Sequence, residues 1–188
     1  MNFKQQLLQM FELSDEQVEL IVSRFVPEEL SKNQLFLEAG KPCNKLSFIE
    51  EGICRVFKWT DTKEVTQWIG NDGYFITDLA SFFFDNPSIA SIEALTPTKL
   101  WTLNKKDYLE IQDSIPNWNV IEKRFIAKCF MQIEHRVFDF IALSAEERYN
   151  KYFEQNKSFF NQVPLQYIAS VLGMSPETLS RIRNKISS

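Results

Sequence analysis

The chain has 188 residues, a net charge of −4, 44% hydrophobic residues and 24% charged residues. This composition is typical of a folded globular protein, and it excludes a disordered chain or a polycation that binds nucleic acid over its whole surface. No apolar run reaches the length of a membrane span and no signal peptide is recognisable, so we expect a cytoplasmic protein without a membrane partner.

The first part of the chain has the periodicity of helices. Leu7, Leu8 and Phe11 recur at helical spacing. Ser14-Asp-Glu-Gln17 is a capping box, which predicts the start of a second helix. We therefore expect helical structure from residue 2 to about 30, with Pro27 ending the pattern.

From about residue 31 to 104 the pattern changes to short β-rich runs separated by turn signals. The runs are Gln34–Leu37, Lys45–Glu50, Ile53–Trp59, Glu64–Ile69, Ile89–Leu95 and Lys99–Leu103. Many short strands at this spacing indicate an antiparallel sandwich or barrel. The three phenylalanines 82–84, which follow Asp78, fit either a short helical turn or a covered loop.

A long helix is predicted after Pro116. Its apolar residues step by three or four and form one stripe: Trp118, Ile121, Phe125, Cys129, Ile133 and Val137. A helix this long and apolar commonly packs beyond its own domain, so we expect these residues to form the interface of a homodimer. The alternative is a helix that folds back on its own barrel.

The end of the chain predicts a helix from Ser144 to about Gln155, a polar loop and then a helix-turn-helix. Gly173 suits the left-handed turn and Ser175 suits the N-cap of the last helix. Leu179 and Ile182 would point inward. The residues predicted to face DNA are Ser175, Glu177, Thr178, Ser180, Arg181, Asn184 and Lys185. The alternative is an ordinary helical hairpin.

This order of elements resembles the Crp–Fnr family of transcription regulators. Phe36-Leu-Glu-Ala-Gly40 and Leu46-Ser-Phe-Ile-Glu-Glu-Gly52 look like the signature of the cyclic-nucleotide-binding jelly roll. The resemblance implies an α+β fold: an N-terminal antiparallel jelly-roll barrel with flanking helices, a long dimerisation helix and a C-terminal helix-turn-helix. It implies three domains, namely a sensor at 1–116, the dimerisation helix at 117–143 and the DNA-binding module at 144–188.

The resemblance also locates an effector pocket, from which this sequence departs. Cyclic-AMP binders of the family carry Gly-Glu-Leu, whose Glu receives a ribose hydroxyl, and then Arg-Ser-Ala, whose Arg pairs with the phosphate. Here the matching residues are 77–79 and 88–90, and Ser88 cannot replace the guanidinium of an arginine. We therefore expect cyclic AMP not to be the effector, and a less anionic ligand or a pocket filled by phenylalanines remains open. The pocket residues are Gly73, Thr77, Asp78, Leu79, Ser88, Ile89 and Ala90.

In the helix-turn-helix the resemblance implies that Arg181 reads a guanine and Glu177 meets a cytosine. Pro176 replaces a residue that is often basic, and the sequence ends two residues after Ile186, so we expect no β-hairpin wing. The implied partners are double-stranded DNA, a second copy of the chain and RNA polymerase.

Other chemistry has little support in the sequence. His135 is the only histidine, and Cys43, Cys54 and Cys129 are widely spaced, so we expect no metal site and no cofactor. No catalytic set can be assembled, so we do not expect an enzyme. Two rival functions remain: a sensor or protein-interaction module whose degenerate helix-turn-helix does not bind DNA, and a subunit of a cyclic-nucleotide-regulated enzyme.

Overall fold

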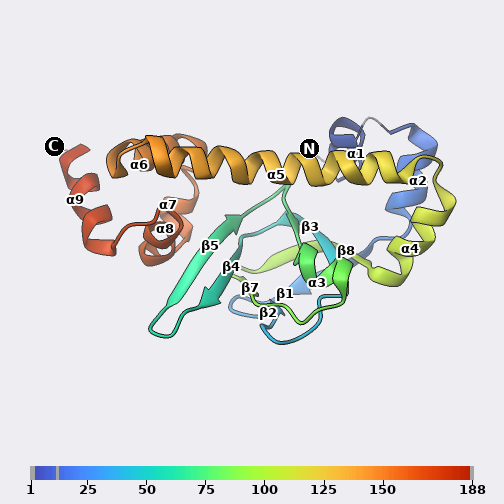
Figure 1. The fold of residues 1–188 in the computed structure, drawn as a ribbon, viewed down its shortest axis with the longest axis horizontal. Helices are drawn as coiled ribbons and strands as arrows, with labels where there is room; N and C mark the ends of the chain where they lie inside the picture. Colours follow the sequence, from blue (N-terminus) through green and yellow to red (C-terminus); the bar gives the residue numbers. More distant parts are fainter. Residues whose placement is uncertain (1–2, 12, 187–188) are drawn as a thin grey trace. The chain divides into compact units, whose positions relative to one another are not determined.

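The structure, a computed structural model, describes residues 3–11 and 13–186. Residues 1, 2, 12, 187 and 188, which the expected helices and domains include, lie outside the described residues. The elements follow one another in this order (Figure 1): α1 (Phe3–Phe11), α2 (Asp15–Val22), β1 (Val26–Leu30), β2 (Leu35–Leu37), β3 (Lys45–Glu51), β4 (Cys54–Trp59), β5 (Glu64–Gly70), β6 (Phe75–Ile76), α3 (Leu79–Phe84), β7 (Ser91–Ala94), β8 (Thr98–Asn104), α4 (Lys105–Ser114), α5 (Trp118–Ala142), α6 (Ala145–Gln155), α7 (Phe159–Gln162), α8 (Leu165–Val171) and α9 (Pro176–Ile186).

The strands form two four-stranded sheets, with the orders β1-β8-β3-β6 and β2-β7-β4-β5. The pairs β1–β8, β3–β8, β3–β6 and β2–β7 are antiparallel. The side chains of Ile49, Ile92 and Leu100 are almost fully buried in one apolar cluster. This arrangement confirms the predicted fold class, an antiparallel jelly roll with flanking helices and one long helix.

The structure corrects the prediction of helical structure up to about residue 30. The helices end at Val22, and Val26–Leu30 forms β1. β1 pairs with β8 along its whole length, from Val26 opposite Thr102 to Leu30 opposite Thr98. The secondary structure of this segment is therefore determined by pairing with a strand far away in the sequence, and local helical periodicity does not determine it.

Other differences are smaller. The segment after Asp78 is the short helix α3, which settles the choice between a helical turn and a covered loop. The polar loop expected after Gln155 contains α7, because Phe159 is 1% exposed and anchors this turn in the core. The capping box at Ser144 begins α6 with both of its hydrogen bonds, as is the case for Ser14 at α2.

The contacts divide the chain into two compact units. The first contains residues 1–56 and 69–127, and the second contains residues 57–68 and 128–188. The second unit therefore includes the outer part of the β4–β5 hairpin together with most of α5 and the helices that follow. Each unit is described by itself below.

The first unit has an aromatic core beneath its helices. Phe3 lies against Phe25 and Phe48, with ring centroids 4.8 and 4.7 Å apart. Phe75 and Phe125 make an edge contact at 5.6 Å. This core joins α1, α2 and α4 to β3, β6 and the first turns of α5.

Candidate functional sites

The N-terminus of α3 is the centre of the expected effector pocket, and Asp78 occupies it. One carboxylate oxygen of Asp78, Oδ1, accepts the backbone N–H groups of Ala80 at 3.0 Å and Ser81 at 3.2 Å. The other oxygen, Oδ2, accepts a hydrogen bond from the Ser88 hydroxyl at 2.6 Å. Ser88 itself is 3% exposed. The carboxylate is thus engaged by the protein on both oxygens, where the pattern of cyclic-AMP binders expects a ligand.

Two further predicted residues lie near these groups. The Thr77 hydroxyl donates to the backbone carbonyl of Lys45 at 3.0 Å, and the backbone N–H of Ala90 donates to Ser88 Oγ at 3.1 Å. The structure therefore brings Thr77, Asp78, Ser88 and Ala90 together around one helix end.

The remaining three predicted pocket residues make different contacts. The backbone N–H of Gly73 donates to the carbonyl of Ile49 at 2.9 Å in a turn. The side chain of Leu79 lines a separate apolar cavity. Ile89 is 73% exposed. Nothing in these contacts joins them to the Asp78 group.

The jelly roll contains one buried cation, Arg55, whose charge is balanced internally. Its side chain is 4% exposed and its guanidinium contacts Glu93 Oε2, with Nε at 2.7 Å and Nη2 at 2.6 Å. Lys99 lies on the surface and pairs with Glu51 at 2.7 Å. An anionic ligand that used Arg55 would have to compete with a carboxylate already in contact.

In the second unit α8 and α9 are joined by a tight turn at Gly173, whose φ is +65°. The backbone N–H of Met174 donates to the carbonyl of Ala169, and the N–H of Gly173 donates to Ser170, both at 3.0 Å. These two bonds form a Schellman motif. A Cβ at Gly173 would lie 2.5 Å from a ring carbon of Phe140, so both the backbone conformation and the space require glycine.

The exposure of α9 agrees with the sequence prediction. Leu179 and Ile182 are buried, at 0% and 9% exposure. Ser175 accepts the backbone N–H of Thr178 at 3.2 Å and caps the helix. Of the predicted DNA-facing residues, Thr178 is half-buried and these are exposed: Ser175, Glu177, Ser180, Arg181, Asn184 and Lys185.

Two charged side chains of this face have neighbours within the second unit. Lys185 Nζ lies 2.7 Å from Glu146 Oε2 on α6. The Ser175 hydroxyl lowers the pKa of the Glu177 carboxyl, and the charge of Arg181 adds a smaller effect in the same direction. Arg181 and Glu177 thus lie on the same side of α9, one helical turn apart.

Two arginines that the sequence analysis did not single out hold the end of α8. Arg136 Nη2 donates to the carbonyl of Val171 at 2.8 Å, and Arg148 Nε donates to the carbonyl of Leu172 at 3.2 Å. Both guanidinium groups also lie over the ring of Phe140, at 5.5 and 4.9 Å. Carbonyls that a helix C-terminus leaves without partners are thereby satisfied by cations.

The outer β4–β5 hairpin contacts the same helix. The backbone N–H of Thr66 donates to Ser170 Oγ at 2.9 Å. Arg136 also donates to the carbonyl of Gln67 through Nη1, and its guanidinium lies 5.5 Å from the Trp68 ring. Burial lowers the pKa of Arg136. These contacts link residues far apart in the sequence, so they could not be predicted from the helical periodicity around Arg136.

The apolar stripe of α5 divides into two parts. Trp118, Ile121 and Phe125 pack against the aromatic core of the first unit. Ile133 and Val137 are 54% and 53% exposed, and Cys129 is half-buried. Other apolar residues of α5 that remain exposed are Ile126, Phe130, Met131, Phe138, Phe140 and Ile141.

Residues 3–11 and 13–186 contain no group of three or more histidine, cysteine or acidic residues arranged to hold a metal ion. The side chain of His135 is 70% exposed. Among the helices of these same ranges, none is both long and apolar enough to cross a membrane.

The comparisons with known proteins agree with this architecture. Residues 27–114 match the family model of the cyclic nucleotide-binding domain. The chain is similar in structure to the catabolite activator protein of Thermus thermophilus, with a TM-score of 0.61 and 20% identity over 97% of this chain and 86% of that one. It is also similar to FixK2 of Bradyrhizobium japonicum, with a TM-score of 0.71 and 15% identity over 87% and 84% of the two chains.

A third similar structure is a Eubacterium rectale protein described under the crp/fnr family of transcriptional regulators. Its TM-score is 0.70, with 19% identity over 94% of this chain and 84% of that one. At these identities the likeness shows a common fold. No curated protein matches the sequence.

Proposed function

We propose that this protein is a cytoplasmic, homodimeric transcription regulator of the Crp–Fnr type that binds double-stranded DNA, with RNA polymerase as a further partner. The observation that carries the proposal is the exposed polar and cationic face of α9. A Schellman turn precedes this helix, and Ser175 caps its first turn. The match of residues 27–114 to the cyclic nucleotide-binding domain favours a regulator over an enzyme. The three-part organisation of sensor, dimer helix and DNA-binding module belongs to the same proposal.

On DNA, α9 would enter the major groove with Glu177 and Arg181 on the side that faces the base edges. A guanidinium matches the two acceptors of guanine, and a carboxylate accepts from the amino group of cytosine. Ser175, Thr178, Ser180, Asn184 and Lys185 surround this pair and would contact bases or phosphates.

Selection of bound duplexes from a random DNA pool tests the proposal. We expect a symmetric site whose half-sites lie about one helical turn, roughly 34 Å, apart. Arg181→Ala serves as the matched control because the side chain is exposed and the fold does not depend on it. If the native protein enriches no sequence over the Arg181→Ala variant, α9 is not a reading helix.

The dimer would use the exposed apolar part of α5, with Ile133 and Val137 at its centre. Residues 130, 133, 137 and 141 recur at spacings of three and four, which is the spacing of a helix pair, and all are at least half exposed. Replacing Ile133 and Val137 by Glu would place like charges opposite each other and separate the subunits. Sedimentation should change from dimer to monomer, and a native protein that sediments as a monomer at micromolar concentration would contradict the proposal.

The effector is proposed not to be cyclic AMP. Asp78 already bonds the N–H groups at the start of α3 and the hydroxyl of Ser88, and Arg55 is neutralised by Glu93. A cyclic phosphate would meet one carboxylate without an available guanidinium. Calorimetry should detect no binding of cyclic AMP below about millimolar concentration, and micromolar binding would contradict the proposal.

Within the second unit, the outer β4–β5 hairpin would support the turn before α9. The hairpin strands continue into the jelly roll, and their outer part bonds to Ser170 and, through Arg136, to the end of α8. A change in the conformation of these strands would therefore alter the support of the turn before α9.

One observation favours the second candidate, a sensor or protein-interaction module that does not bind DNA. Lys185, the last cation of the face, already pairs with Glu146. The DNA selection separates the two functions, since a module without DNA binding enriches nothing whatever its oligomeric state.

A further inference from the structure

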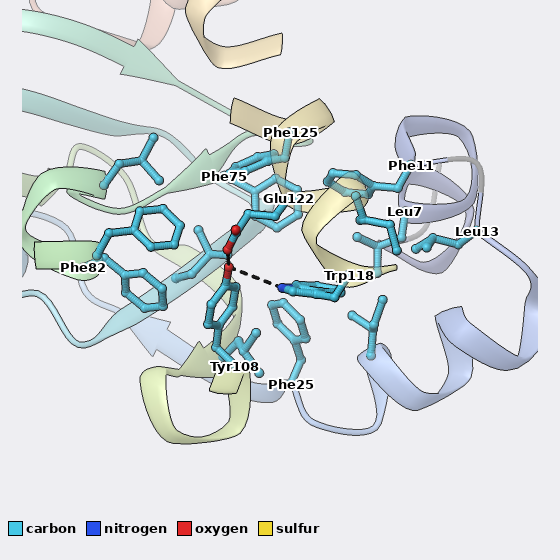
Figure 2. A pocket seen from close by; sticks show the side chains of 16 residues that line it. Leu7, Phe11, Leu13, Phe25, Phe75, Phe82, Tyr108, Trp118, Glu122 and Phe125 are labelled. Atoms are coloured by element: carbon cyan, nitrogen blue, oxygen red, sulfur yellow. Dashed lines mark hydrogen bonds between the residues drawn. The ribbon is translucent and has the colours of Figure 1, made fainter. Parts of the chain in front are cut away.

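The apolar cavity that Leu79 lines lies in the first unit. It has a volume of about 60 Å³, is partly open, and is lined by side chains of α1, α2, α3, α4, the first turns of α5, strands β3, β6 and β8, and the loops before and after α2 (Figure 2). Its lining is almost entirely apolar. The aromatic members are Phe11, Phe25, Phe75, Phe82, Phe83, Tyr108, Trp118 and Phe125, and the aliphatic ones are Leu7, Leu13, Ile21, Leu46, Leu79, Leu103 and Ile121.

The polar atoms around the cavity are bonded to one another. The Tyr108 hydroxyl donates to the Glu122 carboxylate, and Trp118 Nε1 donates to the Tyr108 oxygen at 3.4 Å, as Figure 2 shows. Burial raises the pKa of Glu122, and the nearby charge of Lys123 opposes this effect. No other titratable side chain lines the cavity within the described residues. A ligand therefore meets aliphatic side chains and aromatic rings, and the one carboxylate of the described lining, Glu122, is bonded to Tyr108.

We propose that this cavity binds a small neutral apolar molecule, such as one with a single hydrocarbon ring. Apolar cavities can accept apolar molecules, and the volume of this one is several times the roughly 10–15 Å³ that one water requires. Because the cavity is partly open, a ring larger than this volume can extend beyond it. A cationic ligand would lose its hydration, and the one carboxylate of the described lining, Glu122, already accepts the Tyr108 hydroxyl. An anion would in addition be repelled by Glu122.

A ligand in this cavity would contact both α3 and the start of α5. Leu79, Phe82 and Phe83 belong to α3, whose N-terminus carries the Asp78 cap, while Trp118 and Phe125 belong to the start of α5. A molecule in the cavity would therefore pack against α3 and α5 at once. Binding is measured directly, so the test does not depend on whether the protein binds DNA.

The experiment compares toluene, benzylammonium and benzoate, which share a ring and differ in charge. We expect toluene to bind the full chain with a dissociation constant on the order of 1 mM or tighter, a range reasonable for a ligand of this size. It should raise Tm and shift the indole N–H signal of Trp118 in the nitrogen–proton NMR spectrum. Benzylammonium and benzoate should each bind at least about tenfold more weakly at pH 7.

Two variants locate the site. Leu79→Phe adds a ring at the cavity wall and should weaken toluene binding at least about tenfold, with Tm measured without ligand as the check on folding. Ser88→Ala alters the Asp78 group and should leave toluene binding unchanged. The proposal is overturned if toluene leaves the Trp118 signal and Tm unchanged, if benzoate binds as well as toluene, or if Leu79→Phe folds and still binds toluene with native affinity.

Discussion

Two helix ends in this protein are closed by charged side chains of opposite sign. At the start of α3, Asp78 accepts two backbone N–H groups and the hydroxyl of Ser88. At the end of α8, Arg136 and Arg148 donate to the carbonyls of Val171 and Leu172. Both follow from the same rule, since a helix leaves N–H groups unpaired at one end and carbonyls unpaired at the other.

The consequences of the two closures differ. A helix N-terminus favours negative charge, and at α3 the carboxylate of Asp78 takes this position. The arginines at α8 fix a turn whose next helix presents its polar side chains to solvent. The carboxylate of Asp78 therefore stabilises the start of α3, while the two arginines stabilise the turn that precedes α9.

Removing the cation at the end of α8 should have the largest effect on folding. Arg136→Ala takes away the hydrogen bonds that a half-buried charged group donates to Val171 and Gln67, and bonds of this kind are worth about 1.5–3 kcal/mol each. We expect a loss of about 3 kcal/mol in the free energy of unfolding, measured with urea. Arg136→Lys keeps the charge without the planar fork and should recover only part of the loss. An unchanged midpoint for Arg136→Ala would show that the carbonyls at the end of α8 find other partners.

The Arg181→Ala variant tests the exposed face of α9. Arg181→Ala should cost about 1–3 kcal/mol of DNA binding per half-site and relax the preference at one base position, if the side chain pairs with guanine. Its stability in urea should stay near native because the residue is exposed. A selected site that keeps the same bases and affinity without Arg181 would remove the proposed contact.

Breaking the cap of α3 should have a smaller effect. Asp78→Ala removes the acceptor of two backbone N–H groups, and loss of such a cap costs about 0.5–2 kcal/mol. Asp78→Asn keeps one acceptor oxygen and should lose less. Neither variant should gain affinity for cyclic AMP, because Ser88 still supplies no positive charge. Micromolar binding by Asp78→Asn would mean that the carboxylate alone excludes the nucleotide.

The fold was largely predictable because its signals are local. The capping box at Ser14, the turn at Gly173 and alternating strands each act within a few residues. The exception is β1, where pairing with β8 outweighs the helical pattern before Pro27. Local rules fail there because the partner strand lies some seventy positions later.

The sites were only partly predictable for the same reason. The resemblance pointed to Asp78 and Ser88, and the structure adds that the two bond to each other. The role of Arg136 depends on Gln67 and Val171, which no spacing in the sequence connects to it. The apolar stripe of α5 has a single helical period, but its residues lie in two environments: Trp118 packs inward and Ile133 is exposed. Periodicity alone does not distinguish these environments.

Lys185 should show the smallest effect, and one of a different kind. Its ion pair with Glu146 is exposed on both sides, so Lys185→Ala should change stability by less than about 1 kcal/mol. If the lysine contacts a phosphate, its loss weakens all DNA sequences alike and lowers the salt dependence of binding by about one unit per contact. Glu146→Gln is the matched test, because it releases Lys185 from its partner and should strengthen DNA binding at low salt. If both variants bind DNA with the native salt slope, Lys185 serves only its partner on α6, and the cations that act on DNA lie elsewhere on α9.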